Sequence, residues 1–251
     1  MSRLIAIANQ KGGVGKTTTA VNLAACLAEM KPGILLCDLD PQGNATSGSG
    51  AESSQYSAYD VIVTGRNVQD AIVSSATLGM DVMRADIRLA AAEVELVDVP
   101  RREYRFADAI GEMKARYHTI LIDCPPSLGL LTINALTAAD SVLIPIQSEY
   151  YALEGVSALI QTIRRIQQSS NRRLEIEGVL LTMYDGRTNL SLQVASEVKK
   201  HFKGKVFSTI IPRTVRLGEA PSHGLPIHQY DPRSVGTQAY QDLAKEILKR
   251  N

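Results

Sequence analysis

The chain has 251 residues, of which 45% are hydrophobic and 5% aromatic, with no Trp. That length suits one α/β domain, and the hydrophobic fraction supports an aliphatic core and argues against disorder. No apolar run approaches the roughly 18 residues that a membrane-spanning helix needs, and the N-terminus lacks a secretory signal pattern. The three cysteines, Cys26, Cys37 and Cys124, are scattered, which disfavours a disulfide framework or metal cluster and fits a reducing cytoplasm.

The formal net charge is +1, but the charge is unevenly distributed along the chain. Residues 171–251 carry 13 Lys and Arg against 8 Asp and Glu. This basic C-terminal third is either a phosphate-binding face or ordinary solvated surface, and the composition alone does not separate the two.

Short aliphatic runs alternate with segments of helical periodicity. The runs predict strands at residues 4–8, 34–37, 81–84, 119–122, 141–146, 177–182 and 206–211. The periodic segments predict helices at residues 17–30, 88–97, 104–117, 130–137, 153–168, 190–202 and 235–249. A Gly-, Ser- and Asn-rich stretch at 43–55 is predicted to be a loop.

Several of these strands are continuous apolar runs, which is typical of strands covered on both faces. We therefore predict an α/β fold, with a doubly wound, mostly parallel sheet that carries helices on both faces, in a single domain over residues 1–251. Ligands of such sheets bind beyond the carboxyl ends of the strands, where the motifs described next are expected to lie.

A phosphate-binding loop follows the first predicted strand and precedes the first helix. The run QKGGVGKT at residues 10–17 differs from the standard P-loop because Gln10 occupies the position of the first glycine. Backbone N–H groups of such a loop surround phosphate oxygens, and the following helix adds its positive N-terminus. Lys16 is expected to reach the β- and γ-phosphates, and the Thr17 hydroxyl is expected to bind Mg²⁺. We therefore predict that residues 1–251 form a single P-loop ATPase domain with the fold of P-loop NTPases.

Acidic residues follow two other predicted strands. Asp38 and Asp40 come after the second strand, and Asp123 ends the strand at 119–122 in the manner of a Walker B motif. Buried carboxylates are costly unless a cation pairs with them, and Mg²⁺ is the natural partner beside a P-loop. The spacing alone does not separate the roles of Asp38 and Asp40.

Together these motifs resemble the deviant Walker ATPases of the ParA/Soj chromosome- and plasmid-partitioning family, within the class that includes MinD. The resemblance rests on Lys11 before the glycines, on DLDPQGN at 38–44 and on DCPPS at 123–127. It continues through EYYALEG at 149–155, IPR at 211–213 and EAPS at 219–222, and so covers essentially the whole chain.

The resemblance implies an ATP-sandwich homodimer with low intrinsic Mg²⁺-dependent ATPase activity. Lys11 would reach the phosphates bound by the other subunit, and Gly12 would stay small so that the two loops can approach. Asp40 would orient or polarise the attacking water, while Asp38 and Asp123 would hold Mg²⁺ through its waters. The nucleotide-binding set is Lys11, Gly12, Gly13, Val14, Gly15, Lys16, Thr17, Thr18, Pro212, Arg213 and Thr214.

The base-binding part of this set departs from the family pattern. Thr214 stands where the related sequences have Asn, and its single hydroxyl cannot replace the separate NH₂ donor and C=O acceptor of an amide. Threonine can still form a hydrogen bond to the base through its hydroxyl.

The resemblance also implies nonspecific double-stranded DNA binding by the ATP-bound dimer. Arg187 and Arg216 match the family's basic positions, and Lys199, Lys200, Lys203 and Lys205 are further candidates or merely the solvated end of a helix. Contacts of this kind go to phosphates, so they are independent of DNA sequence and weakened by salt. A ParB-like centromere-binding partner would stimulate hydrolysis, and the protein would be cytoplasmic and associated with the nucleoid.

Other functions remain open. A ParA-like ATPase can position a protein cargo, and a MinD-like one associates with membranes through an amphipathic helix beyond the fold, which is not expected here. Nitrogenase-reductase-type iron–sulfur chemistry needs paired cysteines, which are absent from the sequence. Small-molecule kinase or ligase activity has no motif of its own in this chain.

Overall fold

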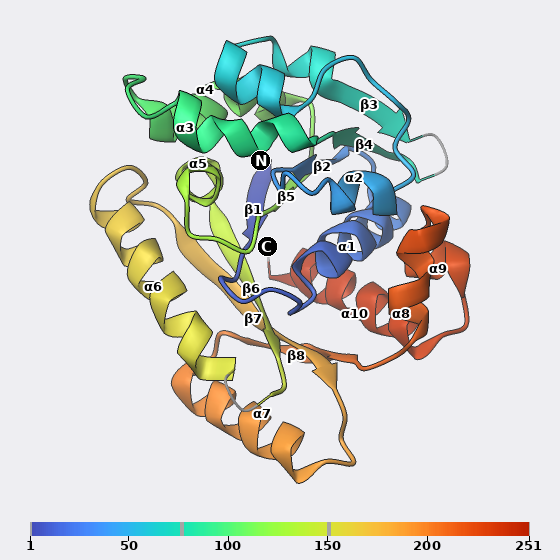
Figure 1. Cartoon of the computed structure of the whole chain (residues 1–251). Helices are drawn as coiled ribbons and strands as arrows, with labels where there is room; N and C mark the ends of the chain where they lie inside the picture. Colours follow the sequence, from blue (N-terminus) through green and yellow to red (C-terminus); the bar gives the residue numbers. More distant parts are fainter. Residues whose placement is uncertain (1, 76–77, 150–151, 251) are drawn as a thin grey trace.

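A central sheet organises the computed structural model, which describes residues 2–75, 78–149 and 152–250 (Figure 1). Its eight strands follow the order β3-β4-β2-β5-β1-β6-β7-β8. All neighbouring pairs are parallel except β3 and β4, so the predicted mostly parallel sheet is confirmed. The strands are β1 (Arg3–Ile7), β2 (Ile34–Asp38), β3 (Ile72–Ser75), β4 (Met80–Met83), β5 (Thr119–Asp123), β6 (Ser141–Gln147), β7 (Glu175–Tyr184) and β8 (Val206–Pro212).

Helices cover both faces of this sheet. Successive side chains of a strand point to opposite faces, so alternate residues of each central strand are buried in two separate cores. In β1, Ile5 and Ile7 pack with α1 (Lys16–Met30) and α10 (Val235–Lys249), whereas Leu4 and Ala6 belong to the opposite core. That second core includes α3 (Ala92–Glu95), α4 (Arg105–Ile110), α5 (Leu130–Ala138), α6 (Ala152–Gln168) and α7 (Asn189–His201). The predicted doubly wound fold is therefore confirmed (Figure 1).

The C-terminal segment returns to the side of α1. After β8, the chain forms α8 (Arg216–Glu219), a 3₁₀ turn (Ala220–His223) and α9 (Ile227–Tyr230) before α10. The Ile227 backbone N–H donates to the Asn22 side-chain oxygen at 2.6 Å, which joins the start of α9 to α1. Helix α1, which follows the glycine-rich loop, is thus covered by residues from the end of the sequence.

Several stretches differ from the sequence-based prediction. Residues 43–55 are not entirely loop, because α2 (Asn44–Gly48) forms there and its Thr46 donates two hydrogen bonds to Asp38. The predicted helix at 88–97 is a 3₁₀ turn (Ile87–Ala91) followed by the single turn of α3. The predicted helix at 104–117 is divided into 3₁₀ turns (Arg102–Tyr104 and Gly111–Ala115) flanking α4. Strand β3 and a π-helix (Asp60–Thr64) were not predicted.

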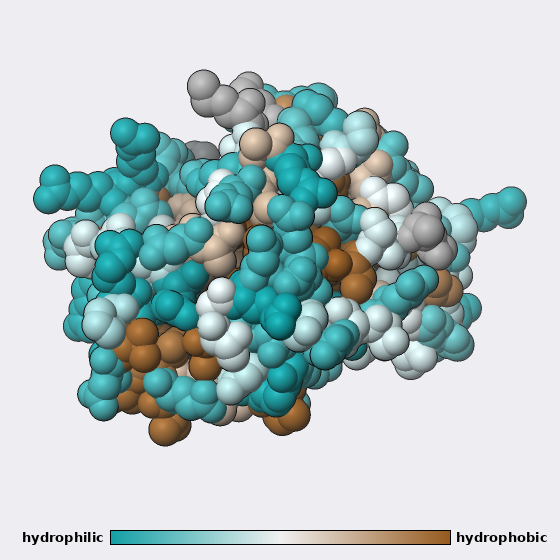
Figure 2. Space-filling view, turned by 90° about the horizontal axis from the view of Figure 1, so that it is seen from above, coloured by the Kyte–Doolittle hydropathy of each residue, from teal (hydrophilic) through white to brown (hydrophobic). Residues whose placement is uncertain are grey.

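Among the described residues, no helix is both long and apolar enough to cross a membrane. The apolar stripe of α10, including Tyr240 and Leu243, is buried against the sheet and α1, as expected for core packing. On the face shown in Figure 2, hydrophobic side chains form separate patches within a mainly hydrophilic surface.

Candidate nucleotide-binding site

The P-loop lies between β1 and α1, at the carboxyl end of the central strand. Gly13 and Gly15 have φ angles of 72° and 85°, a left-handed conformation that glycine adopts without strain. The loop is anchored to its neighbours because Thr182 Oγ1 donates to the Val14 carbonyl at 2.8 Å. Gly15 immediately precedes α1, so the first-turn N–H groups of this helix face the loop, as phosphate binding requires.

The two lysines of the loop have different surroundings. Lys16 is only 6% exposed, and its Nζ donates to the Lys11 carbonyl at 3.1 Å. Burial lowers the pKa of Lys16, an effect that Asp123 opposes. The Lys11 side chain is 35% exposed and its Nζ lies 3.3 Å from Glu149 Oε2. Lys16 therefore points into the site, whereas Lys11 lies at its rim in a solvent-accessible ion pair.

Gly12 lies at the open side of the loop. A Cβ atom placed there would meet nothing within 4 Å among the described residues. The fold of a single chain therefore does not require glycine at this position. Any steric requirement must come from something that approaches the loop from outside.

The acidic residues cluster beside Lys16. Asp38 and Asp123 end adjacent strands and are paired in register, so their carboxylates share one edge of the sheet. Asp38 is fully buried and accepts hydrogen bonds from Thr46 N and Thr46 Oγ1, both at 2.8 Å, and from Asp40 N at 3.1 Å. Burial raises the pKa of Asp38 to about 6, although the Thr46 hydrogen bonds oppose the change. Asp40 is 7% exposed and accepts from Gln42 N at 3.0 Å.

Asp123 differs from Asp38 in having unsatisfied oxygens. It is fully buried, and neither carboxylate oxygen has a hydrogen-bond partner among the described residues. Burial and then the Asp38 carboxylate raise the pKa of Asp123 well above its usual range, while Thr17 and Lys16 act in the opposite direction. A buried carboxylate without partners is costly, and a hydrated divalent cation would supply what it lacks. The oxygen donors of Asp123 and Thr17 therefore fit Mg²⁺.

A cavity of about 390 Å³ continues the site on the other side of the P-loop. Gly15 and Thr18 contribute to one wall, and the predicted base-binding residues Pro212, Arg213 and Thr214 contribute to another. Thr214 Oγ1 accepts from Arg216 N at 3.3 Å, so one of its acceptor positions is already used. The predicted phosphate and base segments are thus brought together, on a mainly apolar surface suited to a purine ring.

Several further lining residues were not predicted from the sequence, among them Met183, Leu217 and Tyr240. Met183 has a φ of 49°, which is uncommon for a residue other than glycine. It lies where the pairing of β7 with β8 is irregular, between Leu181 and Tyr184. No sequence pattern signals that conformation. Tyr240 was expected only as part of the apolar stripe of the last helix, and it serves both the core and the cavity wall.

The candidate DNA-binding residues lie outside this pocket. Arg187 follows β7 and its side chain is 89% exposed, with Asp185 at 2.7 Å. Arg216 begins α8 and lies 3.0 Å from Glu219 and 3.5 Å from Asp231. Both follow the carboxyl ends of adjacent strands, and both are already paired with carboxylates. DNA phosphates would have to compete with these exposed pairs, which are weak individually.

The lysine candidates form a separate group around the end of α7. The four side chains are exposed, and Lys200 Nζ lies 2.6 Å from Glu197. They are Lys199, Lys200, Lys203 and Lys205. Of the motif at 149–155, Tyr150 and Tyr151 lie outside the described residues.

Comparisons with known proteins extend over the whole chain. Residues 2–176 match a family model described as an AAA domain. The chain is 59% identical over 249 residues to the sporulation initiation inhibitor protein Soj of Bacillus subtilis (strain 168), covering 98% of each chain. It is 51% identical over 252 residues to the chromosome partitioning protein ParA of Caulobacter vibrioides (strain NA1000 / CB15N), covering 99% of this chain and 94% of the relative.

A similar solved structure carries the ligands that the site geometry suggests. It is described as cobyrinic acid a,c-diamide synthase from Mycobacterium smegmatis with bound ADP and magnesium. It matches with a TM-score of 0.87 and 37% identity, covering 100% of this chain and 95% of that one. The two proteins therefore share a nucleotide-binding fold throughout their length.

Proposed function

Because this chain belongs to the Soj/ParA family of chromosome-partitioning ATPases, we propose that its ATP-bound homodimer binds nonspecific double-stranded DNA and is released when a ParB-like partner stimulates hydrolysis. The chain is a P-loop ATPase that uses ATP and Mg²⁺. The observation that carries the proposal is the arrangement at the loop, where Lys16 points inward and Lys11 lies at the rim beside the sterically open Gly12.

Within one subunit, the roles of the residues follow from their surroundings. The P-loop backbone and Lys16 would bind the phosphates, and Thr17 and Asp123 would hold Mg²⁺, directly or through its waters. When bound, Mg²⁺ supplies positive charge beside the phosphate oxygens. Asp38 is held by Thr46 and supports the same site, whereas Asp40 is the acid assigned to orient the attacking water.

Lys11 would act in the other subunit. A cation supplied in trans stabilises the charge that builds up on the transferring phosphoryl group. To reach a neighbour's nucleotide, Lys11 must leave Glu149, and this is feasible because the pair is exposed. A single subunit would therefore hydrolyse ATP slowly.

The proposed DNA face comprises Arg187 and Arg216, with the exposed lysines at the end of α7 as additional positive charge. These residues follow β7 and β8 or lie on and just after α7, which connects the two strands, away from the carboxylates on β2 and β5. We propose that the protein acts in the cytoplasm, on the nucleoid. The chromosome partitioning protein ParA of Caulobacter vibrioides is 51% identical, against 37% for the diamide synthase, which favours partitioning over small-molecule ligase activity.

The test is ATP-dependent binding to nonspecific duplex DNA across a salt series. An Asp40→Ala background keeps ATP intact, and Arg187→Ala/Arg216→Ala removes four arginines per dimer. Each phosphate contact contributes about 0.9 to the slope of log K against log salt, where K is the DNA-binding constant. Loss of four contacts should therefore reduce the magnitude of this slope by up to about 4. Arg172→Ala/Arg173→Ala is the matched control, since these exposed arginines precede β7 at the opposite edge of the sheet.

The outcomes separate the rival functions. ATP-dependent binding that is lost with Arg187 and Arg216 but kept in the control supports the proposal. Dimerisation by ATP without any DNA binding would reject it, and binding of the same dimer to anionic vesicles would then indicate a MinD-like role. If the ATP-bound dimer binds neither duplex DNA nor vesicles, a protein cargo becomes the leading alternative.

A further inference from the structure

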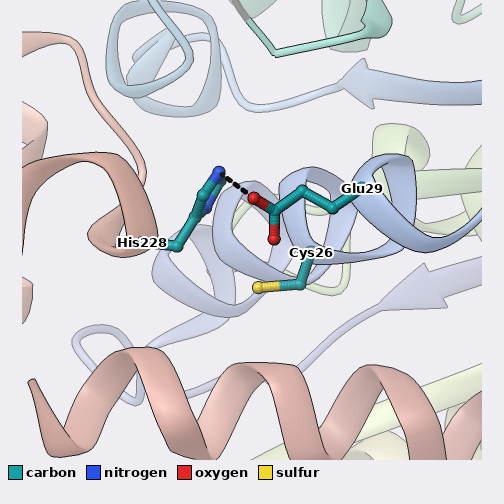
Figure 3. A group of neighbouring side chains, drawn as sticks. All are labelled: Cys26, Glu29 and His228. Carbon is teal, nitrogen blue, oxygen red and sulfur yellow. Dashed lines mark ion pairs between the residues drawn. The ribbon is translucent and has the colours of Figure 1, made fainter. Parts of the chain in front are cut away.

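One side of the nucleotide-binding helix α1 carries a stripe of three polar or sulfur-bearing residues that face α9. Asn22, Cys26 and Glu29 are spaced by four and three positions, so they lie along one face of the helix. Asn22 accepts the Ile227 N–H, and the next residue of α9 is His228. The Cys26 sulfur, a Glu29 carboxylate oxygen and a His228 ring nitrogen lie within 4.8 Å of one another (Figure 3).

His228 is not satisfied as an ordinary buried histidine would be. It is 8% exposed, its Nε2 lies 3.5 Å from Glu29 Oε1, and its Nδ1 is buried without a hydrogen-bond partner among the described residues. Burial lowers the pKa of His228, while Glu29 opposes this. The neutral imidazole is the form that binds metals, so the ring is available as a ligand at neutral pH.

We propose that Cys26, Glu29 and His228 form a binding site for a single Zn²⁺-type divalent ion. Sulfur, imidazole nitrogen and carboxylate oxygen are the ligand atoms that Zn²⁺ uses, and three protein ligands leave a fourth position for water. A tetrahedral ion with bonds of 2.0–2.3 Å places its ligands about 3.5 Å apart, so the group must contract by roughly 1 Å. The Glu29 side chain is 47% exposed, so it can move and also provides an entrance from solvent.

Binding has a defined proton balance. Burial raises the pKa of the Cys26 thiol to about 12, so in the metal-free protein this sulfur carries its proton. The thiol must lose that proton as the sulfur–metal bond forms, and His228 is already neutral. One proton is therefore released to solvent for each ion bound, and binding strengthens as pH rises.

The proposed ion would connect distant parts of the chain. Cys26 and Glu29 lie on the helix that begins with Lys16, whereas His228 lies on the segment that follows the base-binding residues. The scattered cysteines gave no sign of such a site, because its ligands come together only through the packing of α9 on α1. Binding should raise the stability of the folded chain, since the ligands converge only in the native state.

The test is Co²⁺ binding to the full-length chain, first stripped of metal and then saturated with Mg·ADP to occupy the carboxylate site. The expected result is a near-ultraviolet thiolate-to-cobalt charge-transfer band that saturates at one Co²⁺ per chain and is displaced by Zn²⁺. Cys26→Ser should abolish the band, and Glu29→Gln and His228→Gln should weaken binding by at least about tenfold. The control is Cys37→Ala, which removes another buried thiol and should leave the band unchanged.

The variants also keep the test independent of folding. Glu29 is half-exposed, so Glu29→Gln should fold normally even if Cys26→Ser does not. Zn²⁺ should raise the melting temperature of the wild type and of Cys37→Ala by more than that of His228→Gln. Absence of the band in the wild type overturns the proposal, as does unchanged affinity in both Glu29→Gln and His228→Gln.

Discussion

The clearest quantitative prediction concerns Asp38, whose carboxylate is fully buried at the end of β2. Its pKa is raised by burial from 3.8 to about 6, so the ionised form is disfavoured in the folded, nucleotide-free protein. The contribution of Asp38 to the free energy of unfolding is therefore fully present below the pKa that it has in the unfolded chain. This contribution decreases as pH rises toward the pKa that Asp38 has in the folded protein. At about 1.4 kcal/mol per pH unit, the decrease between pH 4.5 and pH 7.5 is about 2 kcal/mol.

Asp38→Asn removes this titration. Urea unfolding in metal-free buffer should show that the free energy of unfolding of the variant, minus that of the wild type, rises by about 2 kcal/mol from pH 4.5 to pH 7.5. The amide also places its NH₂ group opposite a backbone donor, either Thr46 N or Asp40 N, which adds a pH-independent penalty. Only the change with pH tests the reasoning, so the sign at a single pH is not diagnostic.

Glu246→Gln provides a control of opposite sign. Burial acts to raise the pKa of Glu246, but hydrogen bonds from Ser208 and Thr209 lower it to about 2. The ionised Glu246 stabilises the fold at neutral pH, and this contribution is lost in acid. The free energy of unfolding of Glu246→Gln should therefore approach that of the wild type as pH falls. A difference between Asp38→Asn and wild type that stays flat with pH would refute the electrostatic account of the site.

Three further predictions concern the P-loop. Lys11→Ala should leave nucleotide binding nearly unchanged but reduce partner-stimulated ATP turnover by about 10³-fold, and equal turnover in a phosphate-release assay would remove Lys11 from catalysis. Gly12→Val should bind ADP normally, because a Cβ at this position meets nothing within the described chain. With ATP the variant should fail to dimerise in size-exclusion chromatography, because the added side chain would meet the other subunit; an ATP dimer of normal stability contradicts this. Thr182→Val leaves the buried Val14 carbonyl without its hydrogen bond and should cost about 1–2 kcal/mol in urea unfolding and weaken ADP binding, whereas wild-type values for both would show that this anchor is unimportant.

The sequence predicted the central elements well because their signals are local. Strands β1, β2 and β5 are short aliphatic runs, and the predicted bounds agree with the structure to within one residue at each end. The P-loop and the acids that follow β2 and β5 could be located from these runs, since the carboxyl ends of parallel strands share one edge. The sequence therefore placed Lys16, Asp38 and Asp123 together.

Elements that depend on tertiary contacts were not predictable in the same way. Strand β3 contains two serines and pairs only at the sheet edge, so it lacks the apolar run that marked the other strands. Helix α2 is short and is fixed by the hydrogen bonds from Thr46 to Asp38, which no periodicity reveals. The ion pair between Lys11 and Glu149 and the meeting of Cys26 with His228 depend on packing between segments far apart in sequence.

The segment at the end of β8 connects the cavity proposed for the base to a charged residue on the outer face. Residues Pro212, Arg213 and Thr214 line the cavity proposed for the base, and Arg216 follows only two positions later. The Thr214 hydroxyl also accepts the Arg216 backbone N–H, so a displacement of one shifts the other. Exchange of the nucleotide would then alter the charged outer face through one short, hydrogen-bonded turn, without a long-range rearrangement of the sheet. Lengthening this turn by a residue should leave ATP hydrolysis intact while uncoupling it from the DNA binding proposed above.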